Sequence, residues 1–175
     1  MRLLKSGKLP PERLPSVIEM VSRRGDAADL GFLFEQVTRE DGWTGDTAVA
    51  ALRGLASAAE NRKIKPEGDL SKLAVLFETE RPAEVRAQAV RLAGLWRVPE
   101  LAASLQVVVK SEATSPETRA AALQALAGYG EEGRKTIESL AGGEGPLAVR
   151  AGAIAALAGL DLNASAKHAA AALAS

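Results

Sequence analysis

Three apolar segments of the chain share the same order of residue types, and an arginine precedes each of them. Arg86, Arg119 and Arg150 lie 33 and then 31 residues apart. In all three copies, alanine follows at one and three residues, an aliphatic residue at four, and an apolar residue at seven. Positions three, four and seven residues apart share one face of an α-helix. A helix that recurs every thirty-odd residues, with room for a second helix in between, is typical of an α-solenoid.

The residues around these segments carry helix-start signals. Ser115 stands at an N-cap position and Pro116 at the first helical position, and Pro82 and Pro146 are placed alike in the other two copies. Alanine and leucine dominate, aromatic residues make up only 3%, and no alternating β-branched run predicts a strand. Further helices are predicted over residues 11–24, 26–40, 69–80, 99–112, 131–142 and 163–175. We therefore predict an all-α fold, a right-handed α-solenoid of about four helix pairs plus a helix at each end, about ten helices in all.

The repeats give the predicted domain organisation. Residues 1–175 form a single repeat domain, with its best repeats at 69–97, 98–130 and 131–160, a divergent repeat at 26–60, a linker at 61–68 and an unpaired last helix at 162–174. From Ala151 onward only Asp161 and Lys167 are charged at neutral pH. Solenoids need polar capping repeats at their ends. We therefore expect the chain to be a piece of a longer protein, or its last helix to self-associate.

The segments "PAEVRAQAVRLAGL", "PETRAAALQALAGY" and "PLAVRAGAIAALAGL" resemble HEAT repeats, and the resemblance extends over residues 26–160. In that family the arginine meets an acidic residue from the turn between paired helices. The resemblance thus implies an inter-repeat ladder, in which Arg86, Arg119 and Arg150 meet Glu80, Glu112 and Glu144. From the residues alone, the guanidinium can satisfy either turn carbonyls or a carboxylate.

A second resemblance concerns "RRGDAADLGFLFEQV", "GDLSKL" and "VRLAGLW". These segments are similar to the HEAT-like array of large bacterial exported proteins, where it lies between a dehydrogenase-like propeller and a haem c domain. The C-x-x-C-H motif of that haem domain is absent from this cysteine-free chain. The resemblance implies a soluble, extracytoplasmic module of a larger bacterial protein.

Composition and motifs argue against several kinds of chemistry. Basic and acidic residues number 22 each, with 11 of each sign in residues 1–70, whereas nucleic-acid binders carry a basic surplus. No apolar run reaches the roughly 18–20 residues of a membrane span.

His168 is the only histidine. Without cysteine, a single histidine supplies too few ligands for a typical zinc site. The "GYGEEG" motif follows a predicted helix and carries Glu131 and Glu132, so it predicts a helix–helix turn, not a dinucleotide loop. We expect no catalytic residue, no metal and no cofactor.

HEAT-like arrays usually recruit partners on their concave face, so the resemblance directs attention to the outward residues of the second helices. One column there reads Ala50, Arg91, Gln124, Ala155 and its neighbour Thr47, Gln88, Ala121, Gly152. We select Gln88, Arg91 and Gln124 as candidate partner-binding residues, with Trp43, an aromatic residue expected to be exposed. The leading interpretation is a non-enzymatic scaffold for protein–protein or interdomain contacts. The alternative is a HEAT-like enzyme or lyase-type module that acts on a small ligand or nucleobase.

Overall fold

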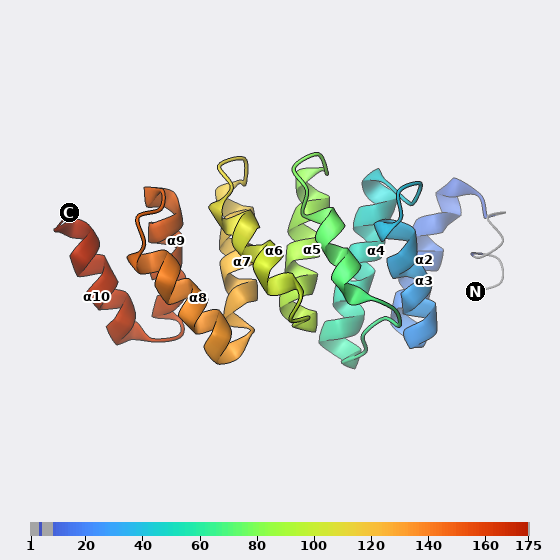
Figure 1. Cartoon of the computed structure of the whole chain (residues 1–175). Helices are drawn as coiled ribbons and strands as arrows, with labels where there is room; N and C mark the ends of the chain where they lie inside the picture. The colour runs from blue at the N-terminus through green and yellow to red at the C-terminus, as the bar shows by residue number, and fades with distance from the viewer. Residues whose placement is uncertain (1–3, 5–8, 175) are drawn as a thin grey trace. The chain divides into compact units, whose positions relative to one another are not determined.

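The structure, a computed structural model, describes residue 4 and residues 9–174. Within these residues all regular structure is helical and no strand occurs (Figure 1). The α-helices are α2 (Leu14–Arg24), α3 (Ala27–Thr38), α4 (Gly45–Ser57), α5 (Ala83–Trp96), α6 (Leu101–Lys110), α7 (Pro116–Ala127), α8 (Gly130–Gly142), α9 (Leu147–Ala158) and α10 (Leu162–Leu173). Short helices are η1 (Pro11–Arg13), the π-helical η2 (Ala58–Arg62) and the 3₁₀-helical η3 (Leu70–Leu76). The prediction of an all-α fold built from helix pairs is confirmed.

The chain divides into two compact units, Met1–Trp96 and Arg97–Ser175. The division falls at the predicted junction between the repeats at 69–97 and 98–130. The assignment of residues 1–175 to one repeat domain stays a prediction. Among the described residues, none of the helices combines the length and the apolar character needed to cross a membrane.

In the first unit, α2, α4 and α5 form one layer, because α4 contacts both of the others, and α3 packs with η3 in the second layer. The helices α2 and α4 meet at Ser22 and Gly54, where a Cβ atom on the glycine would lie 2.1 Å from the serine Oγ. Trp96 is fully buried and stands edge-on to Phe34, with ring centroids 5.3 Å apart. Aromatic and aliphatic burial of this kind, at roughly 1.5–3 kcal/mol per large side chain, holds the two layers together.

The helix predicted over residues 69–80 is a seven-residue 3₁₀-helix, Leu70–Leu76. The chain before it is tied to α3, because the backbone N–H of Glu67 donates to the carbonyl of Ala27 at 2.9 Å. Asp69 then accepts from both the N–H and the hydroxyl of Ser71, a local turn that competes with a regular α-helical start. The second layer of this unit thus pairs the twelve-residue α-helix α3 with a seven-residue 3₁₀-helix. The predicted linker also begins late, because η2 continues α4 to Arg62.

In the second unit, α7 and α9 form one layer, and α6, α8 and α10 form the other. The start of α7 is as predicted: the Ser115 hydroxyl accepts from the N–H of Thr118 at 3.2 Å and Pro116 is the first helical residue. The other two prolines differ. Pro82 directly precedes α5 and Pro146 is the N-cap of α9, because each of these helices begins one residue after its proline.

Candidate functional site

Two of the three arginines that lead the repeated segments, Arg86 and Arg119, bind backbone carbonyls that precede their own helix. Arg119 donates from Nε to the carbonyl of Val109 and from Nη2 to the carbonyl of Ser111, both at 2.9 Å. Arg86, which is buried, donates from Nη1 to the carbonyl of Thr79 at 3.4 Å. Carbonyls in the last turn of a helix lack a partner inside that helix. The arginine of α7 therefore caps the preceding helix of its own pair, α6.

The glutamates assigned to the ladder do not take part in these contacts. Among the described residues, no ion pair joins any of the three arginines to a glutamate of its turn. Glu80, Glu112 and Glu144 are all exposed, where an ion pair would gain little. The third arginine, Arg150, has a buried Nε without a hydrogen-bond partner in the described part of the chain. Where the arginines are paired, the acceptor is a turn carbonyl, so the carboxylate ladder implied by the resemblance is not what the structure forms.

Two ion pairs instead join α4 and its π-helical end to α5. Arg53 pairs with Glu84, and Glu60 pairs with Arg91 at 2.6 Å. In each pair the partners are 31 residues apart. All four side chains are more than a third exposed, so each pair contributes at most about 1 kcal/mol to stability. The two ion pairs therefore place charges on the surface but add little to the free energy of unfolding.

The candidate residues Gln88 and Arg91 lie on this surface. Gln88 is on the same face of α5 as Glu84 and Arg91, one helical turn from each. Its amide oxygen is buried and has no hydrogen-bond partner among the described residues. We call Arg53, Glu60, Glu84, Gln88 and Arg91 the α4–α5 surface. It combines two exposed ion pairs with the half-buried side chain of Gln88.

The other two candidate residues lie elsewhere. Gln124 is exposed on α7, in the second unit. Trp43 is half-buried, in contrast to the expectation that it is exposed. The turn between α3 and α4 folds back on α3, since the N–H of Trp43 donates to the carbonyl of Gln36 at 2.7 Å. This places the indole ring edge-on to Phe32, with centroids 6.4 Å apart.

Sequence reasoning missed a set of contacts at the ends of the helices. Arg62 donates to the carbonyls of Ser22 and Gly25 at 3.0 and 2.6 Å, and Lys65 donates to the carbonyl of Trp96. Cations are favourable at helix C-termini, where the dipole is negative. In the second unit the Tyr129 hydroxyl donates to the carbonyl of Val98 at 3.0 Å. The Lys65 and Tyr129 contacts share a 31-residue offset with the two ion pairs above, which is a sequence signal that could have found these two. The Arg62 contacts span 40 and 37 residues and carry no such signal.

A family model for HEAT repeats matches residues 70–158, just over half of the chain. The chain belongs to the HEAT-repeat family. No curated protein and no solved structure matches it. HEAT repeats generally mediate protein–protein interaction and are typically non-enzymatic. The second resemblance, to the array of large exported bacterial proteins, stays a prediction.

A polar network joins α8 to α10 in the second unit. Arg134 on α8 binds Glu131 through two hydrogen bonds, at 2.9 and 3.1 Å, and lies 3.6 Å from both Glu138 and Asp161, the N-cap of α10. Glu138 in turn lies 4.0 Å from Nε2 of His168. The Arg134 hydrogen bond and charge lower the pKa of Glu131, and the same contact raises the pKa of Arg134. The network attaches α10 to α8.

The remaining titratable groups offer no alternative centre in the described residues. No group of three or more histidine, cysteine, aspartate or glutamate side chains there is placed to hold a metal ion. The "GYGEEG" motif forms the predicted turn between α7 and α8: Gly128 is the C-cap of α7, Gly130 has a φ of +67°, and Glu131 and Glu132 occupy the first turn of α8. Negative side chains favour a helix N-terminus and would repel a phosphate there.

Proposed function

We propose that this HEAT-repeat protein is a non-enzymatic scaffold that binds a protein, or a neighbouring domain of the same polypeptide, through the α4–α5 surface. The observation that carries the proposal is the presence of two exposed ion pairs, Arg53–Glu84 and Glu60–Arg91, side by side across α4, its π-helical end and α5. The charged side chains of a partner can exchange with these ion pairs, which cost little to open. Arginine is also enriched at protein interfaces, which supports the choice of Arg91.

The proposal includes a second contact, self-association through α10. Only Ser165 of this helix is buried, whereas Leu162 and Leu173 are 71% and 90% exposed. Apolar side chains exposed on one helix favour association with another apolar surface. Light scattering over a concentration series tests this contact: the mean mass rises with concentration if α10 self-associates, and a constant mass excludes it.

Affinity capture with matched variants tests the scaffold function. The full chain is used to capture proteins from an extract of the source cells, and the captured proteins are identified by mass spectrometry. Arg91→Glu reverses a charge within the α4–α5 surface, whereas the control Arg97→Glu makes the same charge change at an exposed residue just after α5. We expect the wild type and the control to retain one protein that Arg91→Glu loses. Capture that is unaffected by Arg91→Glu, or lost equally in both variants, contradicts the proposal.

A further inference from the structure

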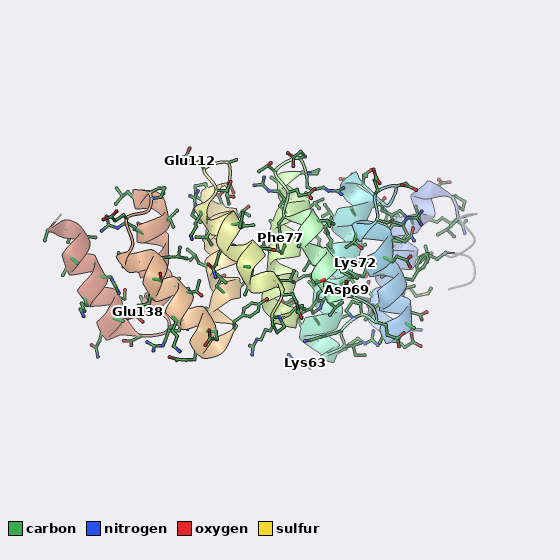
Figure 2. All side chains as sticks on the ribbon, in the orientation of Figure 1. Lys63, Asp69, Lys72, Phe77, Glu112 and Glu138 are labelled. Carbon is green, nitrogen blue, oxygen red and sulfur yellow. The ribbon has the colours of Figure 1, made fainter. Side chains whose placement is uncertain are left out.

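The second layer of the first unit contains an open groove of about 720 Å³. One wall is α3 and the other is the segment 67–75, which runs from the linker into η3 and carries Asp69 and Lys72 (Figure 2). The corresponding groove between α6 and α8, in the other unit, has about 240 Å³. The difference follows from the fold, because η3 is a seven-residue 3₁₀-helix where α6 and α8 are regular α-helices of 10 and 13 residues.

The groove has apolar side chains along its length. Phe32, Phe34 and Val75 line it, together with Gly31, the residue before Phe32 on α3. Gly31 keeps the two walls close, since a Cβ atom there would come within 2.8 Å of the carbonyl oxygen of Glu67. Phe32 and Val75 are half-buried, so each still has apolar surface to bury against a ligand. A volume of this size lies within the range of roughly 300–1,000 Å³ seen in binding clefts.

Three carboxylates, on Glu35, Glu67 and Asp69, line the groove together with two cations, on Arg39 and Lys72, so negative charge is in excess. Arg39 lies 3.3 Å from Asp41, which is outside the groove. The pKa of Asp69 is held below its usual range by its hydrogen bonds with Ser71 and, to a lesser extent, by the charge of Lys72. Glu35 and Glu67, one on each wall, are both exposed and have no ion-pair partner among the described residues.

We propose that this groove binds a short segment of a partner protein in which aliphatic side chains alternate with lysine or arginine. The aliphatic side chains pack on Phe32 and Val75, and the cations pair with Glu35 and Glu67. The same two carboxylates repel acidic segments. The groove therefore discriminates between basic and acidic partner segments by charge. The inference rests on the proposed protein-binding function and adds a second surface, on the layer opposite the α4–α5 surface.

Fluorescence anisotropy with the full chain tests the groove. The probes are two labelled peptides, one of alternating leucine and lysine and one of alternating leucine and glutamate. The double variant Glu35→Lys/Glu67→Lys changes the groove. The control Glu112→Lys/Glu144→Lys makes the same change in net charge at exposed residues outside it. We expect the leucine–lysine peptide to bind the wild type and the control alike, and the groove variant about tenfold more weakly.

A further variant, Val75→Gln, keeps the charges and removes the apolar contact, and we expect it to weaken the same peptide. Equal binding to the groove variant and the control means that net charge alone attracts the peptide, and this overturns the inference. Binding of the leucine–glutamate peptide with equal affinity, or no binding of either peptide, overturns it as well. Arg91→Glu should leave peptide binding unchanged, so loss of native-partner capture in that variant reports on the α4–α5 surface alone.

Discussion

Replacement of Arg119 by methionine tests whether this arginine stabilises the HEAT pair through backbone carbonyls. Methionine keeps an apolar stem of similar length but removes the two hydrogen bonds to Val109 and Ser111. Val109 is fully buried, so its carbonyl loses its partner without gaining water, at a cost of about 1–3 kcal/mol. Loss of the cation at the end of α6 adds about 0.3–1 kcal/mol. We therefore expect the free energy of unfolding to fall by about 3 kcal/mol.

Urea and thermal unfolding, followed by circular dichroism of the full chain, measure this change. In a protein of this size 3 kcal/mol corresponds to a fall in Tm of about 6–12 °C. Glu112→Gln is the matched variant, because it removes the carboxylate of the proposed ladder, and it should change the free energy by less than about 0.5 kcal/mol. The reasoning is refuted if Glu112→Gln destabilises as much as Arg119→Met, or if Arg119→Met has no effect.

Three further predictions concern single residues. Burial raises the pKa of Tyr129, the only tyrosine, to about 12. Its stabilising contribution is thus complete below pH ~10, the unfolded pKa, and is lost as the pH rises toward 12. Tyrosinate absorbance of the folded chain should titrate near 12 and that of the urea-unfolded chain near ~10. Arg97 has a φ of +51°, so Arg97→Gly should raise the free energy of unfolding in urea by about 0.5–1 kcal/mol; a fall would contradict the left-handed conformation. Leu126 is 1% exposed, and Leu126→Ala should lower that free energy by about 2–5 kcal/mol, whereas a loss under 1 kcal/mol would place it outside the core.

The helices could be predicted from the sequence where their determinants are local. The apolar spacing behind Arg119, together with the Ser115 cap, places α7 correctly, because both act within a few residues of the helix that they specify. The element at Leu70–Leu76 could not be predicted in this way. The Asp69–Ser71 turn at its start is local, but the chain before it is held by a backbone hydrogen bond from Glu67 to Ala27, forty residues earlier, which the local residue pattern does not encode.

The candidate site was predictable only in part, for a related reason. The repeat alignment places Gln88 and Arg91 on one face of α5, because positions that share a face follow from helical periodicity. It does not predict that Gln88 is half-buried. It cannot identify the acceptor of Arg119, since every residue has a carbonyl and only the fold decides which one is in reach. The exposure of Trp43 depends in the same way on how its turn folds back on α3.

Photo-crosslinking at Gln88 tests most directly the claim that the protein is a scaffold that binds through the α4–α5 surface. A photoreactive amino acid replaces Gln88 in the source cells, and the control carries it at Glu112, which is exposed in the other unit. The account predicts a crosslink from position 88 to the protein that affinity capture identifies, and none from position 112. No crosslink at position 88, or equal crosslinks at both positions, would contradict it.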